Sequence, residues 1–194
     1  GPLDLQIHSG ESVALVGPSG IGKTTIAATI MGLIPPVSGR VHTTGRVRYL
    51  AQNAHVFITS IAENVRIGAR QATDEEVVTA LQRAGLDLPP DRLVGEDGAT
   101  ISGGEAQRLA LARVLVSHAT STGDGETHGS TPVPVADTAP GDVLILDEPT
   151  EHLDVETSEA LMDDLWATTP GAAKLVITHD PLVMERCDRV WELG

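Results

Sequence analysis

The sequence predicts an α/β fold with a mostly parallel sheet, and three observations support this prediction. Largely apolar runs at residues 13–16, 143–146 and 174–177 are typical of strands buried on both faces. A helix-like pattern follows each run, as in units of strand, helix and parallel strand. After the first run, residues 17–25 match the pattern G-x-x-x-x-G-K-T, which binds phosphate between a strand and a helix.

Length and composition indicate a single globular domain. The chain has 194 residues, 41% of them hydrophobic, which is too short for two ordinary domains. No apolar run approaches the roughly 18 residues that a membrane helix needs, and the start does not match a signal peptide, so we expect a soluble chain. Because no Met begins it, we interpret it as an excised domain. Its first two residues, Gly1 and Pro2, fit either a protease scar or native sequence.

Charge and cysteine content argue against several classes of site. The net charge is −14 and the 13 basic residues are scattered, so we expect no nucleic-acid surface. The single Cys187 excludes an internal disulfide, fits a reducing compartment and is expected to be a small buried residue. None of the seven His residues forms a metal-binding pattern with Cys or another His.

The glycine-rich loop predicts a nucleotide site. Its glycines let successive backbone N–H groups point at a polyphosphate, and the following helix adds its positive end. Lys23 is expected to reach the β and γ phosphates, and the Thr24 hydroxyl to bind Mg²⁺. The nucleotide contacts expected from this stretch are Gly17, Pro18, Ser19, Gly20, Ile21, Gly22, Lys23, Thr24 and Thr25.

Short strands are expected on both sides of this loop. Apolar and polar residues alternate over residues 3–7, which predicts a half-buried strand, and further strands are predicted around Val41 and at residues 47–50. Gln52 follows the last of these, where a strand end opens onto a ligand crevice in α/β sheets. The alternative for Gln52 is a surface amide.

Capping patterns predict helices in the middle of the chain. Ser60 with Glu63 begins a short helix, and Thr73 with Glu76 begins one that ends at Gly85. The composition of residues 118–140, with no apolar period, predicts a disordered surface insertion.

A further pattern, Ser102 with Glu105, has two interpretations. It fits a capping box at the start of a helix. Gly103 and Gly104 would also expose N–H donors and the positive end of that helix to an anion. The residues by themselves leave both interpretations open.

Acidic residues follow the second apolar run. The carboxyl end of a strand is where α/β sheets carry their chemistry, so Asp147 is interpreted as the Walker B magnesium anchor. Glu148 is interpreted as the base that orients the attacking water. Asp154 can cap the next helix. His179 follows the third run and could donate to a γ-phosphate.

In this order the motifs resemble those of the nucleotide-binding domain of an ABC transporter: Walker A, Q-loop Gln52, signature Ser102-Gly103-Gly104, Walker B, D-loop and switch His179. The resemblance covers residues 1–194. It implies a P-loop NTPase (RecA-like) core with an ABC antiparallel β subdomain and an inserted α-helical subdomain. The core would comprise residues 1–58 and 142–194, and the helical subdomain, with the signature, residues 59–117.

Two segments, 51–65 and 93–98, resemble the Q-loop and X-loop of exporters. Residues 147–154 are similar to those of the cysteine and glutathione exporter subunits needed for cytochrome bd assembly, which would imply thiol export. The resemblance also implies two domains, identical or different, that hold two ATP molecules between them. A transmembrane domain, in the same or a separate chain, would place them at the cytoplasmic face of the cell (inner) membrane.

The resemblance assigns roles to residues as follows. The catalytic residues would be Glu148, His179 and Lys23, and the metal ligands Thr24, Gln52 and Asp147. Ser102, Gly103, Gly104 and Glu105 would contact the ATP of the partner protomer, and Asp154 would belong to the D-loop.

Three departures leave alternatives open. Glu105 replaces the family's usual Gln, no residue matches the adenine-stacking aromatic, and residues 118–140 exceed the usual link to Walker B. One alternative is a mainly nucleotide-binding, weakly hydrolytic partner in a heterodimer, which Glu105 favours and Glu148 and His179 oppose. Another is a soluble ABC ATPase of DNA repair or translation, which the low basicity and the absence of long heptad arms oppose.

Overall fold

The computed structural model describes residues 3–52, 55–95, 101–119, 141–151 and 153–194, which form two compact units. The sheet unit holds the described residues 3–52, 141–151 and 170–194. The helical unit holds the described residues 55–95, 101–119 and 153–169. The predicted disordered insertion lies outside the described residues, apart from its first two positions, which continue a helix.

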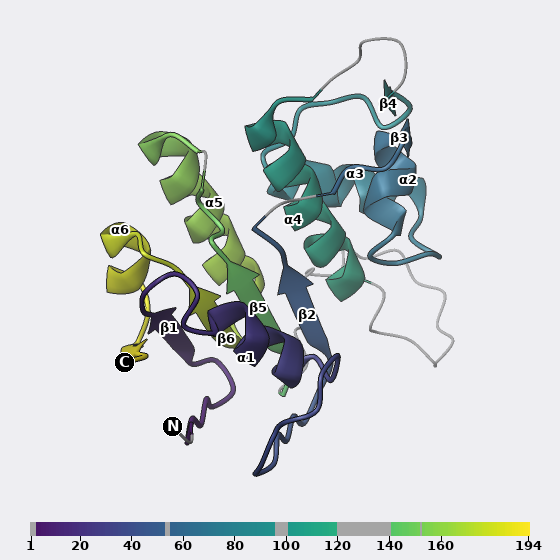
Figure 1. Cartoon of the computed structure of the whole chain (residues 1–194). Coiled ribbons are helices and arrows are strands. Elements are labelled where there is room, and N and C mark those ends of the chain that lie inside the picture. Colours follow the sequence, from purple (N-terminus) through teal and green to yellow (C-terminus); the bar gives the residue numbers. More distant parts are fainter. Residues whose placement is uncertain (1–2, 53–54, 96–100, 120–140, 152) are drawn as a thin grey trace. The chain divides into compact units, whose positions relative to one another are not determined.

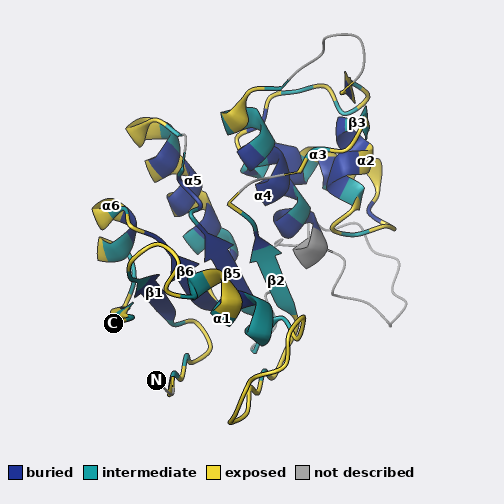
Figure 2. Cartoon of the chain, viewed as in Figure 1, coloured by how far each residue is buried: buried dark blue, intermediate teal, exposed yellow. Residues whose placement is uncertain are grey.

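The sheet unit is built on five strands that all run parallel (Figure 1). Their order across the sheet is β2 (Val47–Leu50), β5 (Val143–Asp147), β6 (Ala173–Ile177), β1 (Ser12–Val16) and β7 (Arg189–Glu192). The strands form where the apolar runs predicted them. Figure 2 shows that β1, β5 and β6 are largely buried, as expected for central strands of a parallel sheet.

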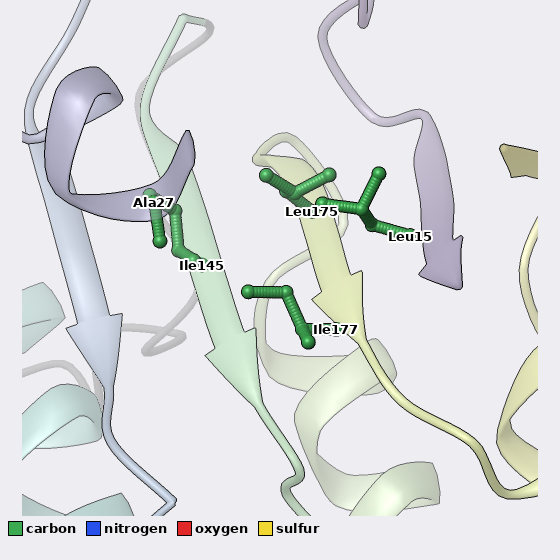
Figure 3. Packing of buried hydrophobic residues seen from close by; sticks show 5 residues of the cluster. All are labelled: Leu15, Ala27, Ile145, Leu175 and Ile177. Atoms are coloured by element: carbon green, nitrogen blue, oxygen red, sulfur yellow. The ribbon is translucent and has the colours of Figure 1, made fainter. Parts of the chain in front are cut away.

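The core of this unit lies between the sheet and helix α1 (Lys23–Ile30). Ala27 of α1 packs in one cluster with Leu15, Ile145, Leu175 and Ile177, and all five are buried (Figure 3). The small Ala27 side chain lets the helix approach the sheet closely. Since α1 begins directly after the glycine-rich loop, this packing also holds the loop at the carboxyl end of β1.

Two predicted strands near the N-terminal end do not form. Residues 3–7 have no strand pairing, because Leu5 and Ile7 pack against the core cluster while the Gln6 carbonyl accepts from the Arg189 guanidinium. Val41 is exposed in an unpaired segment, so no burial favours a strand there. The described residues of the sheet unit therefore contain no strands of the implied antiparallel β subdomain.

The helical unit contains α2 (Ile61–Arg66), α3 (Asp74–Arg83), α4 (Gly103–Ala119) and α5 (Val155–Thr168), with a short antiparallel pair, β3 (Thr59–Ser60) and β4 (Leu93–Val94). The predicted caps are confirmed. The Ser60 hydroxyl accepts from the Glu63 amide, and Thr73 and Glu76 form a reciprocal capping box. No helix among the described residues has the length and apolar character needed to cross a membrane.

Candidate nucleotide site

The loop between β1 and α1 owes its path to glycine. Gly20 and Gly22 have φ angles of 80° and 111°, in the left-handed region that side chains disfavour. Gly17 has a φ of 154° and lies close to β7, since a Cβ there would come 2.9 Å from the Leu193 carbonyl oxygen. The loop therefore turns sharply and leaves its backbone exposed ahead of the N-terminus of α1, the geometry that binds phosphate.

Lys23 is the first residue of α1 and folds back over this loop. Its ammonium donates to the carbonyl oxygens of Gly17, at 2.7 Å, and Pro18, at 3.2 Å. The positive charge is therefore held beside the loop, where a polyphosphate would need it. Thr24 and Thr25 are exposed on the first turn of the helix, so their hydroxyls are accessible.

Asp147 ends β5 and is almost fully buried. Its Oδ2 accepts a hydrogen bond of 2.8 Å from the hydroxyl of Tyr49 on the neighbouring strand β2. Burial first, and then the Asp147 carboxylate, raise the pKa of Tyr49, so the phenol keeps its proton and remains a donor. Sequence reasoning missed Tyr49, because no pattern along the chain shows that β2 lies beside β5.

Glu148 follows Asp147 in an unusual backbone conformation. Its φ is 48°, a positive value rare for a residue with a side chain, and its amide donates to the Ile177 carbonyl at the end of β6. This conformation accompanies a contact between Glu148 Oε1 and His179 Nδ1 at 2.9 Å. Two predicted catalytic residues thus come together at the ends of adjacent strands.

The environments of these two side chains differ. The Glu148 side chain is 13% exposed, whereas that of His179 is 81% exposed. The hydrogen bond to Glu148 raises the pKa of His179, as do the charges of Glu148, Glu151 and Asp180. Since Nδ1 contacts Glu148, Nε2 is the ring nitrogen that remains for another partner.

Gln52 follows β2 and contacts a residue that sequence reasoning did not select. Its side-chain Nε2 donates to Glu151 Oε2 at 2.7 Å. The Glu151 amide in turn donates to the Glu148 carbonyl, so a tight turn connects Glu151 to the end of β5. Gln52 is an exposed amide at the strand end, as its alternative states, and its contact with Glu151 holds its side chain; its role at the nucleotide stays a prediction.

The signature residues and Asp154 belong to the helical unit. Ser102 and Glu105 form the predicted capping box: the Ser102 amide donates to Glu105 Oε2, and the Glu105 amide to Ser102 Oγ. The bond from the Ser102 amide is the main cause of the lowered pKa of Glu105. Asp154 caps α5 by accepting from the Thr157 amide. Anion binding at Gly103 and Gly104 stays a prediction.

The oxygen atoms at the carboxyl ends of the strands are of the kinds that bind a magnesium ion. Mg²⁺ prefers carboxylate, hydroxyl and amide oxygens over nitrogen and sulfur. Asp147, Thr24 and Gln52 supply one donor of each kind, from the carboxyl ends of β5 and β2 and from the first turn of α1. The residues present therefore fit the ion that a nucleoside triphosphate brings with it.

A family model described as ABC transporter matches residues 1–121 of this chain, more than half of its length. The chain belongs to the ABC transporter family. The match includes three motifs identified in the sequence: the glycine-rich loop, Gln52 and the signature residues.

Individual ABC relatives resemble nearly the whole chain. The human mitochondrial potassium channel ATP-binding subunit is 34% identical over 98% of the chain. The glutathione/L-cysteine transport system ATP-binding/permease protein CydD of Bacillus subtilis (strain 168) is 35% identical over 95% of it. The chain spans only 27% and 32%, respectively, of these relatives' own lengths.

Among solved structures, a bacterial Atm1-family ABC exporter with ATP bound matches 97% of the chain with a TM-score of 0.78 and 28% identity. The chain covers 32% of that exporter. This likeness and the relatives identify an exporter-type ABC nucleotide-binding domain.

Proposed function

We propose that this ABC domain binds and hydrolyses ATP as the motor of an exporter-type transporter. One observation carries the proposal: the glycine-rich loop, Glu148, His179 and Gln52 all follow the carboxyl ends of neighbouring parallel strands in one unit. Because adjacent strands lie about 4.8 Å apart, the loop after β1 and the residues after β5 are roughly 10 Å apart across β6. A triphosphate together with its magnesium ion can therefore contact both.

In the proposed reaction, Lys23 and the loop amides bind the β and γ phosphates, and Thr24, Gln52 and Asp147 hold Mg²⁺. The ion supplies positive charge that offsets the phosphate charge. Glu148 orients the attacking water and accepts its proton as the oxygen bonds to the γ-phosphorus and the bond to ADP breaks. His179 holds Glu148 through Nδ1 and offers Nε2 to the γ-phosphate.

The proposal includes a second nucleotide-binding domain, identical or different, whose residues 102–105 would complete each ATP site. The capping box supports this, because it draws the Glu105 carboxylate back to the Ser102 amide and away from Gly103, which is exposed, and Gly104, which is half-buried. Because the box holds the Glu105 carboxylate, Glu105 is a weaker reason to expect a degenerate ATP site. A transmembrane domain would hold this domain at the cytoplasmic face of the inner membrane, and closure of the two nucleotide-binding domains on ATP would move its helices.

For the cargo we propose thiols such as cysteine or glutathione. The B. subtilis relative, whose name carries glutathione and L-cysteine, supports this choice, whereas the human relative is named for a potassium channel. ATP-dependent uptake of labelled glutathione and cysteine into inverted vesicles carrying the complete transporter tests the cargo. Uptake equal to that of vesicles lacking it would rule out both thiols.

The motor function is tested with Glu148→Gln, which removes the proposed base but keeps its size. We expect Mg-ATP to convert this variant to a dimer in light scattering, because ATP is bound but not cleaved, and its ATP turnover to fall by about 100-fold or more. Glu185→Gln, an exposed residue of α6 (Pro181–Glu185), is the matched control and should turn over ATP like the wild type. Full turnover by Glu148→Gln would contradict the assignment.

A further inference from the structure

Glu151 lies at the sheet edge without a role in the reaction described above. It follows β5 by four residues, and Gln52 follows β2 by two. Since β2 and β5 are neighbours in parallel register, the two segments leave the sheet at the same edge. The side chains meet there, with Gln52 Nε2 2.7 Å from Glu151 Oε2.

The position of Glu151 is determined by the turn that precedes it. The Glu148 amide donates to the Ile177 carbonyl, and the Glu151 amide donates back to the Glu148 carbonyl at 3.1 Å. The neighbouring Thr150 is buried, and its hydroxyl donates to Asp180 Oδ2. Glu151 is therefore attached to an ordered part of the unit, whereas Gln52 is exposed and needs a partner to hold one rotamer.

The chemistry of the pair selects one orientation of the Gln52 amide. A carboxylate carries no proton and can only accept hydrogen bonds, whereas a carboxamide has one donating nitrogen and one accepting oxygen. Glu151 must therefore face Nε2. The opposite end of the amide, Oε1, is then the atom that remains for a cation.

We propose that Glu151 is a positioning residue that holds the Gln52 carboxamide so that Oε1, and not Nε2, is available to the magnesium ion of the nucleotide. This inference rests on the proposed function, because it assumes that Gln52 contacts that ion. Glu151 acts through Gln52 and needs no contact with nucleotide. Outer partners of metal ligands commonly act in this way.

A double-mutant cycle of Mg²⁺-dependent nucleotide binding tests the proposal. The four proteins are the wild type, Gln52→Ala, Glu151→Ala and the double variant, with Glu185→Ala as a matched control for loss of an exposed carboxylate. Each is titrated with Mg²⁺ in the presence of a fluorescent ATP analogue. The half-saturating Mg²⁺ concentration and the affinity in EDTA are recorded, and thermal melts check folding.

We expect Glu151→Ala to raise the half-saturating Mg²⁺ concentration by roughly 3- to 10-fold. This effect is smaller than is usual when a residue that supports a metal ligand is removed, because the Gln52–Glu151 pair is partly exposed. In the Gln52→Ala background the same change should have no further effect, since there is no amide left to orient. Affinity in EDTA and the Glu185→Ala control should match the wild type.

Three results would overturn the inference in distinguishable ways. An unchanged half-saturating Mg²⁺ concentration in Glu151→Ala would show that the contact with Glu151 does not orient the Gln52 carboxamide. An equal shift in the Gln52→Ala background would show that Glu151 acts through its own charge or as a ligand. A wild-type protein whose analogue binding ignores Mg²⁺ would remove the proposed site itself, and the inference with it.

Discussion

The phenol of Tyr49 decides how Asp147 is held. Asp147 is almost fully buried and needs a hydrogen-bond donor, since an unpaired buried carboxylate is costly. Tyr49 supplies it at 2.8 Å from the neighbouring strand. The bond leaves Oδ1 of Asp147 for the proposed cation, so this side chain would serve the site while it is held within the fold.

Tyr49→Phe removes this donor and keeps the ring. We expect the free energy of unfolding to fall by about 1 to 2 kcal/mol, the usual cost of leaving a buried acceptor without its partner. Urea denaturation followed by circular dichroism measures the change. Because the ring packing is preserved, a variant as stable as the wild type would show that Asp147 finds another donor.

Among helices and loops, the first turn of α4 carries a capping box at the residues of the predicted signature. Ser102 and Glu105 satisfy each other's amides, which orders the helix start on which the signature glycines lie. The Glu105 carboxylate is occupied by this box, so its extra negative charge relative to Gln is held at the Ser102 backbone.

Glu105 substitutions should separate capping from charge. Glu105→Gln keeps an acceptor for the Ser102 amide and should retain most of the box, whereas Glu105→Ala should cost about 0.5 to 1 kcal/mol and speed exchange of the first amides of α4. Hydrogen exchange by NMR measures both. Equal exchange in Glu105→Ala and the wild type would contradict a role for the box.

The stability of the same helix start should depend on pH. Folding lowers the pKa of Glu105, chiefly through the bond from the Ser102 amide. The box therefore contributes fully above the ordinary carboxyl pKa and is lost as pH falls through the lowered value. Acid-induced acceleration of exchange in α4 should be weaker in Glu105→Gln, which does not titrate.

For the whole molecule, charge argues against nucleic acid as a partner. The net charge of −14 repels a phosphate backbone, and nucleotide binding at the glycine-rich loop uses oriented amides and Lys23 rather than a basic surface. We expect no binding to a labelled DNA duplex at low salt in fluorescence anisotropy, with a basic DNA-binding protein as the positive control. Salt-dependent binding would favour the alternative of a DNA-repair ATPase.

Much of the fold could be predicted from local pattern. The apolar runs predicted the central strands, and the caps at Ser60, Thr73 and Asp154 are formed as expected. The strand expected over residues 3–7 is absent, because apolar alternation records burial and not pairing; Leu5 and Ile7 are partly buried without a strand partner. The subdomain boundaries and the catalytic roles stay predictions.

The sequence by itself determined the family and the central strands of the parallel sheet, because glycine positions, caps and buried strands depend on neighbours along the chain. The roles of the nucleotide-site residues stay predictions from the same motifs. Only the tertiary structure decided which side chains pair. The contacts of Tyr49 with Asp147, Gln52 with Glu151 and Glu148 with His179 join residues 98, 99 and 31 positions apart. Strand order and register, which arise from packing of the whole sheet, bring those residues together.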